Sequence, residues 1–465
     1  MNPGSAAFIG RGRHVALFAA IGAVSACAYG LLSRPESSVF HSIVDIGAWL
    51  RGVGAKPAVV TWPAWGYAWI VAWVPRFDWI IALHASLGAV SLAALAVRLR
   101  LSMPRQSAFI AVLCVLAVPW HDMQLTLYPS GVAGSLALLS LLSLDAALTR
   151  SELRLGVLAG VLMGLADNFR TEFVLLPVFI GVCSIALRRR RFIQPASLRP
   201  LWLFIASALI LQLPWAFFYH AQTGRYSLTE SNFGHVMYVS LGSDPGNPWK
   251  IAGNDAAAMQ AVRDEGYAFS SLSEPGNQVL RRLVLARIKQ HPYALVARTL
   301  QQLRNTFVAP FNWGEPRLDQ AGTRDLDVLR QELKARLGVG VNVAKLDDYR
   351  SRNLYSNAKE NRAAALALSY QIAAVGIGSL VFLLGISGMI LALARGRRLH
   401  APLLLWFLGC AAFYKILQDV LLAYQVNYLN NVYPMFIPFA ALSLTAMIDL
   451  WKGREVLPLE PGIAA

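Results

Sequence analysis

Charged side chains are scarce in this 465-residue chain: 15% of the residues are Asp, Glu, Lys or Arg, whereas 56% are hydrophobic. Too little polar surface is therefore present to cover a water-soluble protein of this size. Cysteine is also rare, and each of the four cysteines lies inside an apolar segment, as is typical of a small core residue. Neither a disulfide framework nor a cysteine-based metal site is predicted.

The motifs of soluble nucleotide-dependent enzymes and hydrolases are absent as well. The sequence contains no Walker loop, nucleophile elbow, HExxH zinc motif or dinucleotide fingerprint. The formal net charge is +16, but the basic residues form short clusters between apolar runs and not patches interleaved with aromatic residues. A cytoplasmic nucleotide-dependent enzyme and a nucleic-acid-binding protein are therefore both disfavoured.

Long apolar runs, in contrast, are frequent and predict an all-α polytopic membrane protein. A helix needs roughly 20 apolar residues to cross the hydrocarbon core, and fewer where its neighbours shield it. About ten spans are expected on this basis, and the first could also be read as a cleaved signal peptide. The expected spans cover 14–33, 79–97, 107–120, 131–148, 155–168, 172–187, 201–219, 367–393, 401–421 and 432–450.

The basic clusters predict the orientation, because Lys and Arg concentrate on the cytoplasmic side of membrane proteins. Ten spans with both termini in the cytoplasm place every cluster on that side. A further span over the tryptophan-rich stretch at 62–73 would turn Arg98, Arg100 and Arg105 outward. We therefore expect that stretch to be an interfacial helix and not a span.

This orientation divides the chain into three parts. Residues 1–219 are expected to form an N-terminal transmembrane module with outer loops at 34–78 and 121–130. Residues 220–366 are expected to form a mostly helical non-cytoplasmic segment, and residues 367–465 hold the C-terminal spans. The middle segment includes an amphipathic stretch from Gln278 to Phe307, which we expect to lie along the membrane surface.

One acidic residue in each outer loop is a candidate catalytic group. Asp45 lies among apolar neighbours at helical spacing, and partial desolvation would make it a better proton acceptor for general-base catalysis. Asp122 follows His121 in the second outer loop. The two acids could share acceptor positioning, or could hold a divalent cation such as Mg²⁺ or Mn²⁺, although their spacing is not specific for a metal. Helix capping is the alternative for each.

Ionisable groups also lie between the two short spans. Asp167, Arg170 and Glu172 would be costly in lipid, so they must face an outer pocket or pair with one another. Arg170 could meet an anionic substrate group. In the middle segment, Arg282 and its basic neighbours could neutralise a lipid phosphate or dock on anionic headgroups. Tyr428 lies at the expected outer mouth of the last span, where interfacial anchoring is the alternative.

The order of these features resembles the GT-C glycosyltransferases, which are polytopic enzymes that use polyprenyl-phosphate sugars. The bacterial family that is similar to protein mannosyltransferases and to the aminoarabinose transferase of lipid A, a glycosyltransferase family 39-like group, is the nearest in pattern. The resemblance covers nearly the whole chain. It rests on Asp45, on Asp122, on the glycine-rich run 156–172 with its Arg-Thr-Glu ending, and on the run 427–434.

Two positions depart from that family's pattern: Asn427 stands where arginine is frequent, and Thr171 replaces the usual proline. The first departure puts a phosphate-binding role at that position in doubt. The resemblance implies an inverting sugar transfer at the non-cytoplasmic face of a bacterial inner membrane, in which Asp45 activates the acceptor and polyprenyl phosphate leaves. The acceptor would be a cell-envelope glycan, lipid or protein.

Charge would develop on the leaving phosphate, so nearby cations would stabilise the transition state more than the ground state. No cofactor is implied with certainty. Substrate-binding roles are expected for Lys56, His121, Arg170, Glu172, Arg282 and Tyr428.

Two other functions stay open. A lipid-linked polysaccharide ligase or polymerase shares the donor class and would be favoured by an outer His and Arg pair acting in place of Asp45. A lipid or sugar transporter of the flippase type would also place polar groups within the bilayer. Transport does not require a large outer segment, and the internal repeats that are typical of transporters are not seen.

Overall fold

The computed structural model describes residues 41–61, 65–74, 77–124, 129–189, 198–242, 247–308, 362–399, 403–421 and 429–453. Every regular element within these ranges is a helix, which confirms the expected all-α class. Five helices in this part of the chain are long and apolar enough to cross a membrane. They cover Trp79–Ser102, Pro129–Arg150, Arg199–Thr223, Gly376–Ala394 and Leu403–Leu421.

The expected total of ten spans stays a prediction. Three of the expected spans correspond to shorter apolar helices, over Pro104–Val115, Thr171–Ala186 and Ile437–Trp451. The expected span at 155–168 corresponds to the 17-residue helix α8 (Leu153–Phe169). The expected first span at 14–33 lies outside the described residues.

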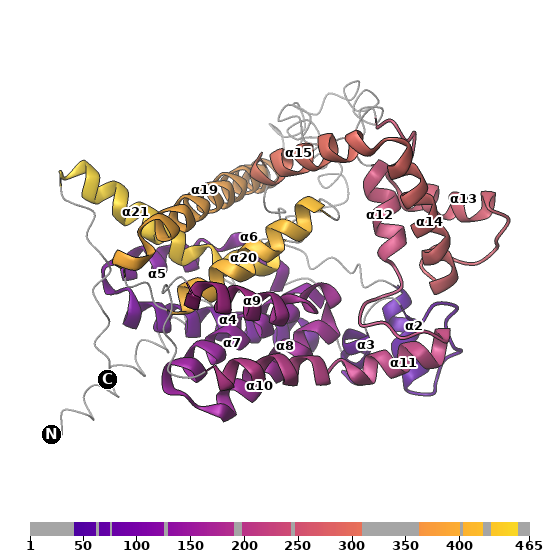
Figure 1. Cartoon of the computed structure of the whole chain (residues 1–465), viewed down its shortest axis with the longest axis horizontal. Coiled ribbons are helices and arrows are strands. Elements are labelled where there is room, and N and C mark those ends of the chain that lie inside the picture. The colour runs from indigo at the N-terminus through magenta and orange to yellow at the C-terminus, as the bar shows by residue number, and fades with distance from the viewer. Residues whose placement is uncertain are drawn as a thin grey trace.

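The centre of the bundle is formed by α7 (Pro129–Arg150), against which α4 (Phe77–Ser102) and α8 pack; α10 (Arg199–Ile210) packs against α8 and lies at the lower edge of the bundle in Figure 1. Helices α7 and α8 pack along each other because the chain reverses at Ser151, which adopts a left-handed conformation with φ of 56°. The remaining helices of the bundle surround this centre. They are η1 (Pro104–Gln106), α5 (Ser107–Val115), α6 (Val118–Gln124), η2 (Thr171–Phe173), α9 (Leu176–Arg189), α19 (Arg362–Leu399), α20 (Leu403–Leu421), η4 (Asn430–Met435) and α21 (Ile437–Trp451).

A glycine stripe brings α8 against α10. Gly156, Gly160 and Gly164 recur every four residues and therefore share one face of α8. A Cβ atom added at Gly156 would lie 2.6 Å from the carbonyl oxygen of Pro200 in α10. Small residues at such spacing allow helix backbones to approach closely, which is how helices commonly associate in membranes.

Ion pairs join several helices at one end of the bundle, which we call the basic end. Arg98 of α4 pairs with Asp145 of α7 at 2.6 Å, and Arg105 of η1 pairs with Asp449 of α21 at 3.1 Å. The C-terminal ends of α4, α7 and α21 therefore lie together. This is the arrangement that the orientation predicted from the basic clusters requires, although the side of the membrane itself stays a prediction.

The opposite end of the bundle carries α2 (His41–Leu50) and α3 (Trp65–Trp73). Helix α3 has nine residues and would span only about 14 Å, which is too short to cross a membrane. Its exposed Trp69 and Trp73 stack with their ring centroids 6.3 Å apart. A short helix with exposed tryptophans matches the expectation of an interfacial element.

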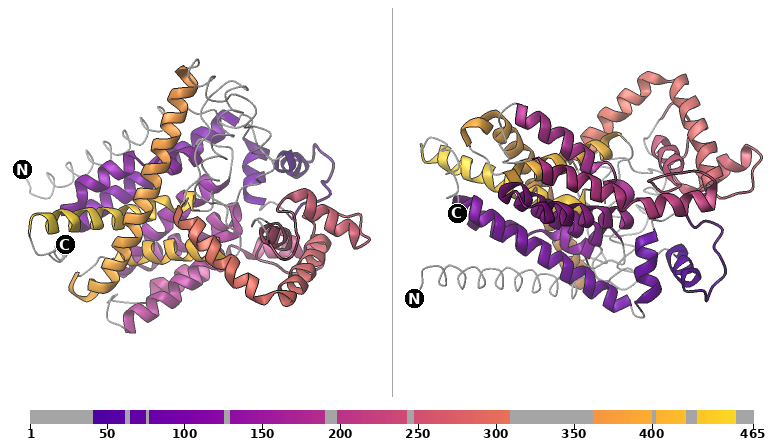
Figure 2. Two further views of the ribbon diagram at one scale, coloured as in Figure 1. Left: turned by 90° about the horizontal axis from the view of Figure 1, so that it is seen from above. Right: turned by 60° about the horizontal axis from the view of Figure 1, so that its bottom comes forward.

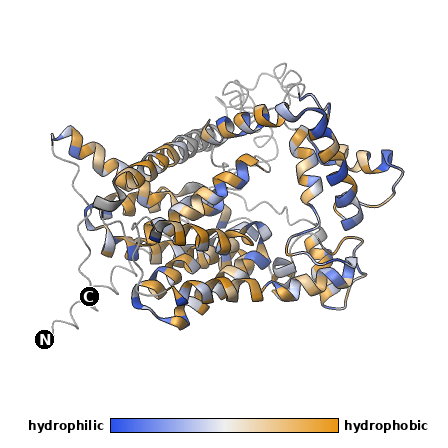
Figure 3. Ribbon diagram, viewed as in Figure 1, coloured by the Kyte–Doolittle hydropathy of each residue, from blue (hydrophilic) through white to orange (hydrophobic). Residues whose placement is uncertain are grey.

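The chain continues through α11 (Leu213–Thr223) to α12 (Phe233–Gly242), α13 (Asp255–Asp264) and α14 (Glu274–Gln290), which lie beyond this end, and α15 (Pro292–Val308) then runs back toward α19 (Figure 1). Helices α12, α13 and α14 share a small apolar core of their own, separate from that of the bundle; Figure 2 shows this α12–α14 unit apart from the bundle in two further directions. Figure 3 shows that the bundle helices are mainly hydrophobic and that hydrophilic residues gather on α13 and α14. The amphipathic stretch expected from Gln278 to Phe307 is divided in two, because His291 ends α14 and Pro292 begins α15.

The glycine stripe gives a test of the α8–α10 packing. A Cβ atom at Gly160 would lie 2.7 Å from the Cβ of Ser207 and would also meet the carbonyl of Phe204. The Gly160→Val variant should therefore lose about 1–3 kcal/mol of stability through overpacking, measured by thermal unfolding in detergent. Gly376→Val is the matched control, because nothing lies within 4 Å of a Cβ at that helical glycine. Equal melting temperatures for the two variants would contradict the close contact.

Candidate functional site

A break between two helices creates the most polar site inside the bundle. Helix α8 ends at Phe169, and Arg170 adopts an extended conformation with φ of −148° and ψ of 105°. Asn168 stabilises the end of the helix by donating its amide to the carbonyl oxygen of Gly164 at 2.9 Å. The chain then enters η2 and α9. This break sets the side chains of Arg170 and Glu172 between helices at the end of the bundle opposite to the basic end.

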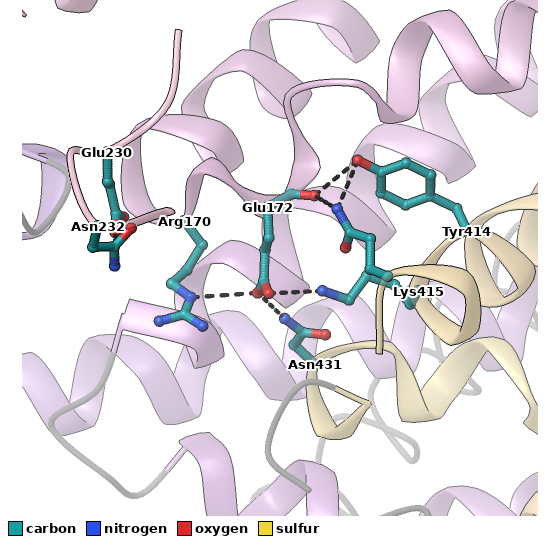
Figure 4. Close-up of polar contacts among 8 residues, drawn as sticks. Arg170, Glu172, Glu230, Asn232, Tyr414, Lys415 and Asn431 are labelled. Atoms are coloured by element: carbon teal, nitrogen blue, oxygen red, sulfur yellow. Dashed lines mark hydrogen bonds and ion pairs between the residues drawn. The ribbon is translucent and has the colours of Figure 1, made fainter. Parts of the chain in front are cut away.

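The carboxylate of Glu172 is the centre of this site. Lys415 of α20 places its Nζ 2.7 Å from Oε2, and Arg170 places its Nε 3.3 Å from Oε1. Asn431 of η4 donates its amide to Oε1 at 2.5 Å. Figure 4 shows these three groups converging on Glu172 from different segments of the chain. We call Arg170, Glu172, Lys415 and Asn431 the Glu172 cluster.

The backbone of the turn between α8 and α9 also forms hydrogen bonds with α20. The carbonyl oxygen of Glu172 accepts hydrogen bonds from Tyr414 Oη at 3.1 Å and from Gln418 Nε2 at 2.7 Å. The ring of Phe173 lies 5.2 Å from Lys415 Nζ, within the range of a cation–π contact. Helix α20 is therefore fixed to the α8–α9 turn by both the main chain and the side chains.

Acids as well as cations lie in and around the Glu172 cluster. Arg170 and Lys415 face the carboxylate of Glu172, the side chain of Lys415 is fully buried, and the buried Asp167 lies close enough to Glu172 for the two carboxylates to interact. A further acid, Asp419, lies one turn after Lys415 and accepts a hydrogen bond from Thr306 of α15 at 2.8 Å. A buried charge is tolerated only when it is paired, so these contacts are needed to keep Lys415 in place. An arrangement of this kind can neutralise the charge of an oxyanion such as a phosphate.

Helices α2 and α3 adjoin the same turn. Trp65 of α3 donates its indole NH to Asn168 Oδ1 at 2.6 Å. A Cβ atom at Gly66 would lie 2.5 Å from the carbonyl oxygen of Asn168, so the two backbones are in direct contact. Because Asn168 lies two residues before Arg170, the candidate base Asp45 on α2 belongs to a helix pair that is anchored beside the Glu172 cluster.

Asp45 itself is not desolvated by its neighbours, contrary to the expectation from its sequence context. Its side chain is exposed, whereas the apolar residues Ile43 and Ile46 are buried toward α3. On a helix, residues one or two positions apart point in different directions. The apolar residues next to Asp45 in the sequence therefore do not cover its carboxylate. The carboxylate is accessible from outside the protein.

Lys56 and Arg282, two expected substrate-binding cations, are not part of the Glu172 cluster in the contacts described. Lys56 is exposed, donates a hydrogen bond to Gln222 at 2.6 Å and lies over the ring of Trp49. Arg282 is exposed on α14. Arg170 and Glu172 are therefore the two expected binding residues that the described structure brings together, and their pairing is the internal ion pair that the sequence left as an alternative.

His121, an expected substrate-binding residue, is not available as a cation near pH 7. It is buried in α6 with its Nε2 3.2 Å from the carbonyl oxygen of Cys114. Burial lowers the pKa of His121 to about 4, and the hydrogen bond to Cys114 opposes this shift only in part. The imidazole is therefore neutral near pH 7. Asp122 also lies in α6, but its side chain and the whole of Tyr428 lie outside the described residues.

Lys415 is the residue of this site that the sequence analysis missed. It lies inside the expected span 401–421, and a lysine within a span is by itself a signal of a polar site. Asn431 belongs to the 427–434 run, yet its contact with Glu172 joins residues 259 positions apart and has no sequence signature.

A second polar constellation has the residue types of a hydrolase triad but not its accessibility. His235 lies 3.1 Å from Ser271 Oγ and 3.0 Å from Asp255 Oδ1. Ser271 is buried, whereas the Asp255 side chain is 83% exposed. A catalytic nucleophile must be reachable by substrate, and the acid that orients the histidine is normally buried. This set meets neither requirement. Its hydrogen bonds join α12, α13 and the segment that precedes α14.

Among the described residues, no three His, Cys, Asp or Glu side chains gather in a way that could hold a metal ion. Comparison with protein-family models, with curated proteins and with solved structures finds no match to this chain. The function therefore has to be argued from the Glu172 cluster and the elements around it.

The burial of Lys415 predicts a large effect of removing its partner. Glu172→Gln should cost about 3 kcal/mol, the lower end of the range for breaking a buried pair, because Asp419 lies one turn away. Glu152→Gln is the matched control, because Glu152 pairs with Arg150 at 3.9 Å between side chains that are at least half exposed, and such pairs contribute about 1 kcal/mol or less. The measurement is unfolding in detergent.

The double variant Glu172→Gln, Lys415→Met separates pairing from packing. It should recover part of the loss, since the unpaired buried ammonium group is also removed. If Glu172→Gln were no less stable than Glu152→Gln, the burial and pairing of Lys415 would be wrong.

Proposed function

We propose that this protein is an integral membrane glycosyltransferase that moves a sugar from a polyprenyl-phosphate donor to an acceptor at the end of the bundle that holds the Glu172 cluster. The observation that carries the proposal is this cluster itself. The two cations Arg170 and Lys415 meet the carboxylate of Glu172 at the end of a bundle of apolar helices, and in this proposal the phosphate of a lipid-linked donor binds beside them. The resemblance of the sequence to the GT-C enzymes is the second support.

In this proposal Arg170 and Lys415 provide the positive potential for the leaving polyprenyl phosphate. Negative charge grows on the phosphate as the glycosidic bond breaks, so fixed cations stabilise the transition state more than the bound donor. Glu172 keeps the two cations apart from each other and oriented. The extracytoplasmic position of the site and the bacterial inner membrane are part of the same proposal.

Asp45 is proposed as the general base that takes the proton of the acceptor. Its exposure is compatible with this role, because an acceptor arriving from outside the membrane must reach it. The α2–α3 pair, anchored at Asn168, would hold the carboxylate near the donor. Its exact separation from the anomeric carbon depends on the bound donor.

The proposal is tested with purified protein in lipid nanodiscs and a panel of synthetic polyprenyl-phosphate sugars. Mass spectrometry would follow release of polyprenyl phosphate and formation of glycosylated acceptor from an envelope extract. Lipid that co-purifies with the protein identifies the donor to include. Movement of intact donor across the bilayer without cleavage of the sugar–phosphate bond would establish a flippase and contradict the proposal.

The role of Asp45 makes a separate prediction. Asp45→Asn should lower transfer by at least about 100-fold, the usual contribution of a general base, while the melting temperature stays unchanged because the side chain is exposed. Glu265→Gln, which alters an exposed acid at the end of α13, should retain full activity. An active Asp45→Asn variant would assign the base to another residue.

A further inference from the structure

Helix α15 buries polar residues and exposes apolar ones, whereas a helix that faces water normally does the opposite. Arg298, Gln302 and Thr306 recur every four residues and are buried. The apolar residues on the other side of the helix are exposed, and at 100° per residue they fall within an arc of roughly 80°. These exposed residues are Tyr293, Val296, Leu300, Leu303 and Phe307. We call them the outer face of α15.

The buried polar side of α15 faces the interior of the protein. Arg298 donates its Nε to the carbonyl oxygen of Ser240 in α12 at 3.3 Å, and Thr306 donates to Asp419 in α20 at 2.8 Å. Polar groups removed from water need partners of this kind. The rotation of α15 about its own axis is therefore fixed, and the outer face is directed away from the protein except at its C-terminal end, where Phe307 also packs against Phe382.

The C-terminal part of α15 lies against helices that are candidates to cross the membrane. The ring centroid of Phe307 lies 5.5 Å from that of Phe382, which belongs to the candidate span Gly376–Ala394. Asp419, the partner of Thr306, belongs to the candidate span Leu403–Leu421. Figure 1 shows α15 extending from the α12–α14 unit toward α19 and α20. The outer face thus continues the apolar surface of the spans.

The helix that precedes α15 has a complementary charge. Its exposed basic residues are Arg281, Arg282, Arg287 and Lys289. Basic residues next to an apolar helix face are the combination that binds an anionic bilayer surface, because the cations contact headgroups while the apolar side chains enter the acyl region. A water-facing helix would show neither the apolar outer face nor the buried polar stripe.

We propose that the outer face of α15 is inserted into the hydrocarbon of the lipid bilayer, with exposed basic residues of α14 at the level of the headgroups. This assignment does not depend on the proposed transferase activity. It replaces one long amphipathic helix on the membrane surface by two helices with separate roles. It also connects the lipid to the Glu172 cluster, since Thr306 on the back of the inserted helix contacts Asp419, one turn from Lys415.

The test uses the full chain in proteoliposomes that contain anionic lipid. Cys27, Cys114, Cys183 and Cys410 are replaced by alanine, and single cysteines are introduced as Leu300→Cys or Leu303→Cys and labelled with bimane. Fluorescence is quenched either by lipids with a nitroxide on the acyl chain or by aqueous iodide. The matched control is Met259→Cys on α13, an exposed apolar position outside α15.

The expected result is that acyl-chain nitroxides quench labels at 300 and 303 at least about twofold more than the label at 259, and that iodide shows the opposite order. Iodide quenching at 300 equal to that at 259 would show that the face is in water and would overturn the proposal. Protection from both quenchers would show that protein covers the face. If dilution of the protein in lipid then restored quenching, the occupant would be a second copy of the chain, which also overturns it.

Discussion

The buried ion pair between Glu172 and Lys415 is the interaction on which the arrangement of the helices at this end of the bundle depends. A lysine with no exposed surface is stable only beside an anion, and the carboxylate that meets it lies in the turn between α8 and α9. Helix α8 ends where Arg170 adopts an extended conformation, and Glu172 follows two residues later, where its side chain contacts Lys415 of α20. The hydrogen bonds from Tyr414 and Gln418 to the same turn then hold the two segments in one register.

The two ends of the bundle use charge in different ways. At the basic end, Arg98 and Arg105 pair with buried acids of neighbouring helices while their own side chains stay partly exposed. At the other end Lys415 is fully buried and Arg170 is partly buried, and both cations face Glu172, with Asp419 one turn from Lys415. Partly exposed pairs position helix ends at modest cost, whereas buried charges interact more strongly because water screens them less. That difference is why the proposed chemistry is assigned to the Glu172 cluster.

Helix α15 links the α12–α14 unit to the region of the Glu172 cluster and carries the proposed lipid contact. Its polar side chains reach Ser240 in the α12–α14 unit and Asp419 in α20, and its apolar side chains are directed outward. The proposed donor site and the proposed membrane contact are therefore connected through α15, although each is tested separately.

The sequence by itself indicated a helical membrane protein. Its long apolar runs and its scarcity of charged residues can be seen without knowing how the helices are arranged. Composition and apolar length were sufficient for the all-α class, and the sequence also singled out Arg170 and Glu172, which the structure brings together. The structure alone decided that His291 divides the amphipathic stretch, that Asp45 is exposed, and that His121 is buried and neutral. It also decided that Lys415 and Asn431 complete the site. These outcomes depend on which faces of separate helices meet, and contacts such as that of Glu172 with Asn431, 259 residues apart, leave no local pattern in the chain.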